Sequence, residues 1–405
     1  MNFIDGGVAA PQGFTTNGLC AGIKAGRTKP DTALIFSERP CAAAGVFTKN
    51  RVQAECVKLS RRHVADGSAQ AVIVNSGNAN ACTGEQGAQA ALRMAQSAAS
   101  CLSLPANEVL VCSTGVIGQQ LPVEKIEAKI SDLVAGLSKE GHRAAREAIM
   151  TTDTRYKEAA LETTIGGKTV RLGTMAKGSG MIHINMGTML GFITTDCAIS
   201  AAMLNKALRE SVAGTYNCVS VDGDTSTNDT LLILANGMAG NQVIDSEGPD
   251  YDAFLSALNQ LNTIMAQRIA ADGEGAEHLV ECRVDGAASV EDARILAKAV
   301  ISSNLVKAAF FGKDANWGRI LCAMGYSGGN FTPEKTSVSF VSKAGSIQVF
   351  QRGVPLNFDE ELARKILTED ETCIMVELQD GTCSGTAWGC DLTYEYVKIN
   401  GDYRT

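Results

Sequence analysis

The feature that most constrains this chain is a run of small and polar residues that ends in one threonine near the middle of the sequence. The run spans residues 177–191 and reads KGSGMIHINMGTMLG. Thr188 follows Gly187, and an apolar, strand-like run at 189–193 comes next. Apolar runs border this stretch on both sides, so it is a poor domain linker and belongs inside a folded unit.

This junction has the residues that a self-cleaving precursor needs. The Thr188 hydroxyl would attack the carbonyl carbon of Gly187 and split the chain. The freed amine of Thr188 would then act as the base for its own hydroxyl. Branching at Cβ restricts χ1 of the threonine, and glycine leaves room for a tight backbone. The alternative from this window alone is a glycine-rich loop that leads into a buried strand.

Composition narrows the classes of partner. A chain of 405 residues has material for two or three structural units. With 45% hydrophobic and 20% charged residues it is ordinary for a globular protein. A net charge of −8 argues against nucleic acid or an anionic membrane as the main partner. No apolar stretch reaches the length of a membrane span, and the N-terminus carries no secretory signal.

The cysteines point to a reducing compartment. There are 13, an odd number, and no CxxC pair occurs. We expect reduced, buried thiols and a cytoplasmic protein, with neither a disulfide framework nor a zinc site. The cysteines in apolar or small-residue settings are Cys82, Cys112, Cys197, Cys218 and Cys322.

Hydrophobic spacing predicts helices that alternate with strands. Two strands joined by Gly166-Gly167 have the pattern of a hairpin, so we expect mixed or antiparallel sheets. Helices are expected at 85–102, 122–137, 198–213, 251–271, 290–310 and 359–367. Strands are expected at 33–36, 71–75, 109–112, 158–164, 168–176, 230–235, 278–284, 336–340 and 374–378, the last two together with 387–399.

Four polar segments are candidates for chemistry. Residues 113–118 (STGVIG) end a strand with closely spaced backbone N–H groups, which can bind an oxyanion; an ordinary turn is the alternative. Residues 75–84 hold three asparagines, which suit either a polar loop or substrate contact. Residues 222–230 lack the glycine and glutamate of a calcium loop and suit a hydrogen-bonded turn near a site. Glu274 lies between two glycines and is a candidate for contact with a cationic group.

The usual cofactor and metal signals are absent from the sequence. The histidines, His63, His142, His183 and His278, show no metal-ligand spacing. We find no nucleophile elbow, P-loop or dinucleotide fingerprint. We therefore expect neither a cofactor nor a metal.

Taken in order, these segments resemble the ornithine acetyltransferases, the bifunctional glutamate N-acetyltransferases of arginine biosynthesis. The resemblance runs nearly from end to end and is carried by many motifs. They are GFTT at 13–16, the segments 75–84, 113–118, 177–188, 222–230 and 272–276, DANWGRI at 314–320, AWGCDLTY at 387–394 and NGDYRT at 400–405.

The resemblance implies roles for particular residues. Thr188 is the family's nucleophile, and cleavage falls between Gly187 and Thr188. Thr114 and Gly115 form the oxyanion hole. The family's substrate-contacting threonine is placed at Thr152, with Thr151 and Thr154 left open. The remaining substrate-binding residues implied, besides Thr188 itself, are Lys177, Glu274, Asn400 and Thr405.

The chain departs from the family pattern at three places. Ile184 stands where the family usually has proline, and Gly187 where it usually has alanine. Either change alters the freedom of the backbone before Thr188 and can slow self-cleavage. Glu277-His278 follows the Gly-Glu-Gly-Ala motif where Thr-Lys is expected.

The fold that the resemblance implies is an α/β, N-terminal-nucleophile-like αββα sandwich with a second α/β lobe. The α chain would be 1–187 and the β chain 188–405, with 188–285 completing the sandwich and 286–405 forming the second lobe. Both products would share one core and assemble as a heterotetramer of two α and two β chains. The substrates implied are N2-acetylornithine and glutamate, and acetyl-CoA stays open as a further donor.

Two other functions stay open at this point. One is a related N-terminal-nucleophile amidohydrolase or aminopeptidase, in which water replaces glutamate as the acceptor. The other is a paralogue that folds without cleavage or catalysis, which the residues at Ile184 and Gly187 suggest.

Overall fold

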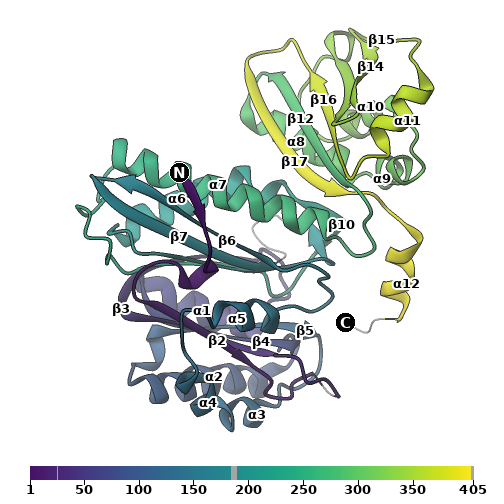
Figure 1. The fold of residues 1–405 in the computed structure, drawn as a ribbon. Coiled ribbons are helices and arrows are strands. Elements are labelled where there is room, and N and C mark those ends of the chain that lie inside the picture. The colour runs from purple at the N-terminus through teal and green to yellow at the C-terminus, as the bar shows by residue number, and fades with distance from the viewer. Residues whose placement is uncertain (25, 184–188, 403–405) are drawn as a thin grey trace.

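The main body of the protein is one nine-stranded sheet that folds over, so that two layers of strands lie between outer helices (Figure 1). The computed structural model describes residues 1–24, 26–183 and 189–402. The αββα arrangement expected from the sequence is confirmed. The strands, in their order across the sheet, are β1 (Asn2–Ile4), β6 (Lys157–Ile165), β7 (Lys168–Lys177), β9 (Leu190–Thr195), β11 (Thr230–Ala235), β3 (Thr32–Phe47), β4 (Ser68–Asn78) and β5 (Val109–Val116), with β2 (Phe14–Leu19) also paired to β3.

Strand β3 joins the two layers. It is 16 residues long and pairs with β2 and β4 through its first part and with β11 through its last part. Its register with β4 shifts between Phe36 and Cys41. Pro40 lies in this interval and has no N–H to donate to a ladder, which suits an irregular point in a strand. The sequence predicted only 33–36 as a strand because the polar residues that follow mask its continuation.

Residues of the inner strands alternate between two hydrophobic clusters. In β11, Leu231 and Ile233 pack with helices α6 (Ala201–Gly214) and α7 (Pro249–Ala271), whereas Leu232 and Leu234 pack with the second strand layer. Successive side chains of a strand point to opposite faces. Both faces of β11 are therefore buried, which explains its unbroken apolar sequence.

The hairpin predicted at Gly166-Gly167 is confirmed. Strands β6 and β7 pair antiparallel up to Ile165 and Lys168, which leaves a two-residue turn. Both glycines have positive φ angles, 54° and 72°, as a type I′ turn requires.

Two short strands, β8 (Ile182–His183) and β10 (Ser220–Thr225), form a separate antiparallel pair.

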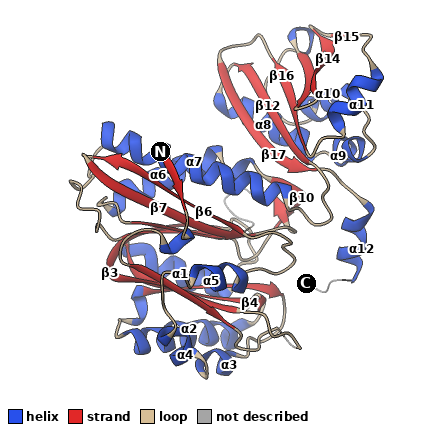
Figure 2. Cartoon of the chain, in the orientation of Figure 1, coloured by secondary structure: helices blue, strands red, loops and turns tan. Residues whose placement is uncertain are grey.

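Helices cover both outer faces of the sandwich (Figure 2). Helix α7 contacts β6 and β7 and begins at Pro249, where proline suits the first turn of a helix. On the opposite side α1 and α2 contact β5. The helices of this body are α1 (Glu55–His63), α2 (Gly84–Leu102), α3 (Val123–Glu127), α4 (Ile130–Ala135), α5 (His142–Ala148), α6 (Ala201–Gly214) and α7 (Pro249–Ala271).

A six-stranded sheet with its own helices forms the second unit. Strand β12 pairs parallel with β16 and antiparallel with β17, and α8 contacts both β12 and β17. The predicted division at residue 286 falls within β12. The elements are β12 (Leu279–Ala287), β13 (Ser337–Ser342), β14 (Gly345–Gln351), β15 (Val354–Pro355), β16 (Glu371–Glu377), β17 (Cys383–Cys390), α8 (Val290–Ser302), α9 (Asn304–Phe311), α10 (Trp317–Gly325) and α11 (Glu360–Leu367). A terminal helix, α12 (Tyr394–Asp402), follows β17.

Three further predicted elements were wrong in extent or type. The helix expected at 122–137 is divided into α3 and α4, although the apolar face continues across the break. The helix expected at 290–310 breaks at Ser303, whose extended backbone ends α8 and whose hydroxyl accepts a hydrogen bond from Val306 N–H to begin α9. The run at 387–399 changes from strand β17 to helix α12.

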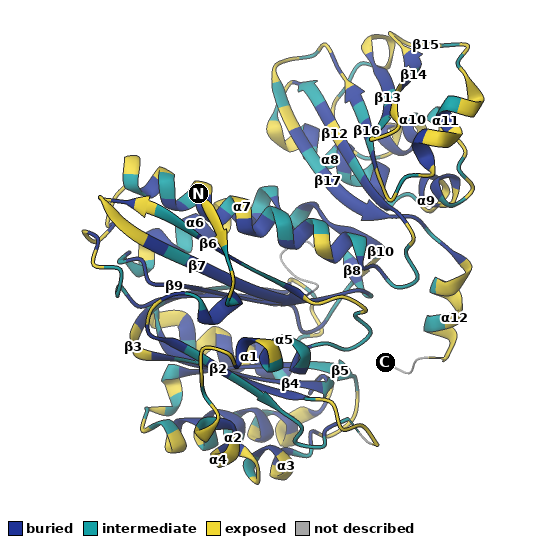
Figure 3. Cartoon of the chain, viewed as in Figure 1, coloured by how far each residue is buried: buried dark blue, intermediate teal, exposed yellow. Residues whose placement is uncertain are grey.

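Exposed residues gather on the outer helices, while the strands of the body are largely buried (Figure 3). All thirteen cysteines are free thiols. Burial was expected for Cys82 and Cys322, but both are exposed. Their small or apolar sequence neighbours do not decide burial, because Cys82 lies in a loop and Cys322 on the outer side of α10. Among the described helices, none combines the length and apolar character needed to cross a bilayer.

Buried ion pairs connect β6 to the residue that follows α7. Lys157, in β6, is 1% exposed and pairs with Asp153 at 2.7 Å and with Asp272, the residue after α7. The two carboxylates are 0% and 2% exposed. Burial raises the pKa of Asp153, but Lys177 and Lys157 together outweigh burial and hold that pKa below its ordinary value. Both carboxylates therefore depend on the lysine ammonium for compensation of their charge.

Replacing Lys157 with methionine should destabilise the protein strongly. The variant would keep the length of the side chain but leave two buried carboxylates without their common partner, which costs about 3–5 kcal/mol. Equilibrium unfolding in urea measures this change. Lys129→Met is the matched control, since Lys129 pairs with Asp132 in solvent and exposed pairs contribute little. Equal unfolding midpoints for the two variants would contradict the role of Lys157.

Candidate active site

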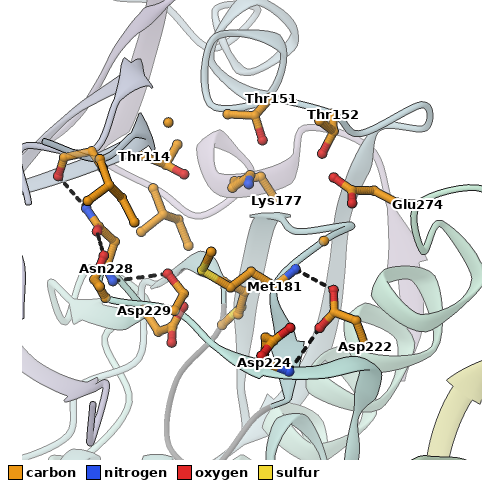
Figure 4. Close-up of a pocket in the computed structure, with 18 of the residues that line it drawn as sticks. Thr114, Thr151, Thr152, Lys177, Met181, Asp222, Asp224, Asn228, Asp229 and Glu274 are labelled. Atoms are coloured by element: carbon orange, nitrogen blue, oxygen red, sulfur yellow. Dashed lines mark hydrogen bonds between the residues drawn. The ribbon is translucent and has the colours of Figure 1, made fainter. Parts of the chain in front are cut away.

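A cavity of about 270 Å³ lies where the ends of β5 and β7 meet the segments that carry Asp222, Glu274 and Asn400 (Figure 4). Its residues come from regions as distant in sequence as Ala79 and Asn400. The site residues predicted from the sequence that lie along this cavity are Thr114, Gly115, Thr152, Lys177, Glu274 and Asn400.

Thr114 and Gly115 line one wall, at the carboxyl end of β5. In the parallel pair of β4 and β5 they lie opposite Ser76 and Gly77. Gly115 has φ of 133°, and a Cβ atom there would lie 2.3 Å from the carbonyl carbon of Gly77. Only glycine fits this close approach of two backbones. The strand thus presents a threonine hydroxyl and backbone groups to the cavity.

Asn228 also lines the cavity and stabilises this wall by hydrogen bonds. Asn228 Nδ2 donates to the carbonyl oxygens of Ala79 at 2.6 Å and Ser113 at 2.8 Å. Two asparagines of the 75–84 segment also donate to nearby backbone oxygens. Asn75 Nδ2 donates to Asn78 O at 3.0 Å, and Asn80 Nδ2 donates to Gly87 O in α2. Of the two interpretations of that segment, the structure favours the polar loop.

Lys177, the last residue of β7, lines the second wall. Its Nζ atom lies 3.9 Å from Oδ2 of Asp153, and the side chain is nearly buried. Thr151 and Thr152 line the cavity beside it, and the hydroxyls of Thr152 and Ser179 are 2.6 Å apart. Thr154 instead donates its hydroxyl to Asp272. Of the three threonines left open by the sequence, 151 and 152 therefore face the cavity.

Glu274 and Asn400 form the third wall. Glu274 follows the end of α7, and its N–H donates to Ser179 O at 2.9 Å. Gly180 lets the carboxylate approach, because a Cβ atom at position 180 would lie 2.3 Å from the Glu274 carboxyl carbon. Asn400, in α12, donates from Nδ2 to Glu274 Oε2 at 2.8 Å. The C-terminal helix thus reaches the cavity through Glu274.

Three further carboxylates were not singled out in the sequence. Asp222, Asp224 and Asp229 line the cavity and belong to the segment predicted only as a turn near a site. Asp222 accepts hydrogen bonds from the N–H groups of Met181 at 2.6 Å and Ile182 at 2.8 Å. The sequence feature that could have indicated them is the density of acidic and hydroxyl residues just before an apolar strand. That density does not show where each side chain points.

The cavity has an acidic character. Among the described residues that line it, Asp222, Asp224, Asp229 and Glu274 are carboxylates, and Lys177 is the one basic side chain. Burial raises the pKa of the Asp229 carboxyl well above its ordinary value, and its Oδ2 atom has no hydrogen-bond partner. Burial also raises the pKa of Asp222, although its backbone hydrogen bonds work in the other direction. A bound ammonium group would offset this effect of burial, and Lys177 offers a positive charge, so the site suits a ligand that carries ammonium groups and a carboxylate.

Three predicted site residues, Gly187, Thr188 and Thr405, lie outside the described residues. Met189 and Leu190, which follow Thr188 in the chain, line the cavity. Leu190 begins β9, which pairs antiparallel with β7 from Lys177 onward.

Comparison with known proteins identifies the family of this chain. The model of the ArgJ family matches residues 15–405. The arginine biosynthesis bifunctional protein ArgJ of Symbiobacterium thermophilum is 53% identical over 406 residues, and that of Caldanaerobacter subterraneus is 49% identical over 405; each match covers 100% of both chains. The crystal structure of the protein of that name from Bacillus halodurans is 44% identical, with a TM-score of 0.51, and covers 53% of this chain and 100% of its own. The family model and the full-length relatives confirm the resemblance to the ornithine acetyltransferases. The chain therefore belongs to the ArgJ family and is an acyltransferase of arginine biosynthesis.

Proposed function

We propose that the protein transfers an acetyl group from N2-acetylornithine to L-glutamate through an acetyl ester on Thr188. In this ping-pong cycle ornithine leaves before glutamate enters. The observation that carries the proposal is the composition of the cavity. It combines Thr114, Gly115 and Lys177 from before the predicted cleavage junction with Glu274 and Asn400 from after it.

Each half of the cycle needs the same groups. The Thr188 hydroxyl gives its proton to the Thr188 amine as its oxygen attacks the acetyl carbonyl carbon, and Thr114 with Gly115 stabilises the oxyanion of the tetrahedral intermediate. The carbon–nitrogen bond then breaks, and the leaving amine of ornithine takes a proton from the amine of Thr188. Glutamate reverses these steps: its amine attacks the ester and gives its proton back, and N-acetylglutamate leaves with Thr188 restored.

The charges of the cavity support amino-acid substrates. Lys177 would bind the α-carboxylate, and Glu274 would orient an amino group. Asp222 lies on the same side of the cavity as Glu274 (Figure 4), and Asp224 also lines the cavity. These carboxylates favour a donor that carries a second ammonium group. Thr152, Asn400 and Thr405 complete the proposed substrate contacts.

Self-cleavage between Gly187 and Thr188 is part of the proposal. The solved relative from Bacillus halodurans supports it, because that chain is matched along its whole length by only 53% of this one. The products, 1–187 and 188–405, would stay together: β9 and β11 from the second product lie between β7 and β3 from the first. The second product would include 188–285 in the sandwich and 286–405 as the second lobe. Two such pairs would form the heterotetramer.

Acetyl-CoA is proposed as a second acetyl donor. The relatives from Symbiobacterium and Caldanaerobacter carry the word bifunctional in their names, which supports a second activity. The acetyl chemistry proposed needs no cofactor and no metal, because the nucleophile, base and oxyanion donors all come from the chain. The free thiols support a cytoplasmic location.

The cleavage prediction concerns Thr188. The wild-type protein should yield two fragments, the second beginning at Thr188, because its hydroxyl attacks the preceding carbonyl. Thr188→Ala removes that hydroxyl and should give one intact chain without transferase activity. Intact mass spectrometry after long incubation decides both points. Thr188→Ser keeps a hydroxyl and is the control that should still cleave. A wild-type protein that is active while uncut would contradict the mechanism.

The acetyl-enzyme should be observable with donor alone. Incubation of the cleaved protein with N2-acetylornithine should add the mass of one acetyl group to the fragment that begins at Thr188. Glutamate should then remove it and appear as N-acetylglutamate, measured by chromatography. Release of acetate at the same rate with or without glutamate would instead identify a hydrolase.

Thr114→Ala should slow transfer and leave the fold intact. Loss of one oxyanion donor costs about 10²–10³ in kcat in other enzymes. Steady-state kinetics with N2-acetylornithine and glutamate measures the effect, and circular dichroism checks the fold. Thr114→Ser retains the hydroxyl and should recover most of the rate. If Thr114→Ala cleaves and turns over like the wild type, its side chain is no donor.

A further inference from the structure

Glu277, His278 and Asp391 form a cluster of possible metal ligands outside the cavity. Each offers one ligand atom, and these atoms lie within 4.8 Å of one another. Glu277 and His278 immediately precede β12, whereas Asp391 immediately follows β17. His278 and Asp391 are buried, and Glu277 is exposed to solvent.

The Asp391 carboxylate is only half satisfied by the protein. Its Oδ1 atom accepts hydrogen bonds from the N–H groups of Glu277 at 2.9 Å and His278 at 3.1 Å. Its Oδ2 atom is buried and has no hydrogen-bond partner, and the residue is 3% exposed. A buried carboxylate oxygen without a partner is costly, so this atom favours a cation beside it.

His278 is oriented as a metal-binding histidine usually is. Its Nδ1 atom lies 3.0 Å from the carbonyl oxygen of Glu369. A carbonyl only accepts hydrogen bonds, so Nδ1 donates to it, and in the neutral ring Nε2 is the nitrogen with a lone pair for a metal. Metal-ligating histidines commonly donate their other nitrogen to a backbone carbonyl in this way.

We propose that Glu277, His278 and Asp391 bind one divalent transition-metal ion of the zinc type. One imidazole, two carboxylates and a water supply the four nitrogen and oxygen ligands that a tetrahedral zinc ion takes. Bonds of about 2.0–2.2 Å bring such ligands closer together than 4.8 Å, and the exposed Glu277 side chain can turn inward to close the site. A nitrogen ligand disfavours calcium and magnesium, which prefer oxygen.

The bound ion would link the segment that follows Glu274 to the segment that leads to Asn400, and these two residues form the third wall of the cavity. Thr393 already donates its hydroxyl to Gly275 O at 2.7 Å, and Asn400 donates to Glu274. The metal ligands are close in sequence to Gly275 and Thr393, and they do not line the cavity themselves. The ion would thus stabilise a structural junction, and the proposal does not depend on the acetyl-transfer mechanism.

Isothermal titration of the full-length, chelator-treated protein with zinc chloride tests the proposal. The wild type should bind one zinc ion per chain with a defined affinity. Glu277→Gln removes an exposed ligand without endangering the core, and it should weaken binding at least as much as the loss of an outer-sphere partner, about 10–100-fold. Glu291→Gln, at an exposed site in α8, is the matched control and should bind as the wild type does.

Thermal unfolding gives a second readout. Zinc should raise the melting temperature of the wild type and of Glu291→Gln, and it should do so far less for Glu277→Gln and Asp391→Asn. If Asp391→Asn fails to fold, Glu277→Gln still decides the matter. Absence of zinc binding by the wild type would overturn the proposal. So would equal affinity in wild type and Glu277→Gln, as adventitious binding at the exposed thiols of Cys82 and Cys322 would give.

Discussion

The buried ion pairs of Lys157 with Asp153 and Asp272 are the interaction on which the cavity depends. Asp153 also accepts hydrogen bonds from the N–H groups of Thr151 and Gly178. Asp272 accepts hydrogen bonds from the N–H groups of Thr154 and Arg155, which follow Asp153 in the chain. The threonine loop, the end of β7 and the end of α7 therefore meet at one set of compensated charges. Charges buried this deeply are tolerated only when every partner is present, so the network fixes three segments of the site relative to one another.

The second constraint is the way the halves of the chain share one sheet. Strand β9 is hydrogen-bonded to β7 on one side and to β11 on the other, and β11 is bonded in turn to β3. A break in the chain just before β9 would remove one peptide bond and none of these ladders. Residues on the two sides of the junction can therefore form one cavity whether or not the chain is continuous.

The third wall depends on the second unit. Strand β17 leads directly into the segment of Asp391 and Thr393 and then into α12, which carries Asn400 to Glu274. An isolated bridge between Val219 and Trp388 further joins the two units. The six-stranded sheet thus acts as the support that holds the C-terminal helix beside the cavity, although most of it lies far from the site (Figure 1).

The sequence by itself determined the local elements and the residues whose constraints are local. The β6–β7 hairpin, the buried run of β11, helix α7, and the motifs of Thr114, Gly115 and Glu274 could all be recognised, because turn chemistry and hydrophobic period act over a few residues. Only the tertiary structure decided that Asp222, Asp224 and Asp229 gather around a cavity with Lys177, that Lys157 joins two buried aspartates, and that Asp391 meets His278 across 113 positions. These are matters of burial and charge compensation, whose free energy is set by neighbours far away in the chain and leaves no periodic trace in the sequence.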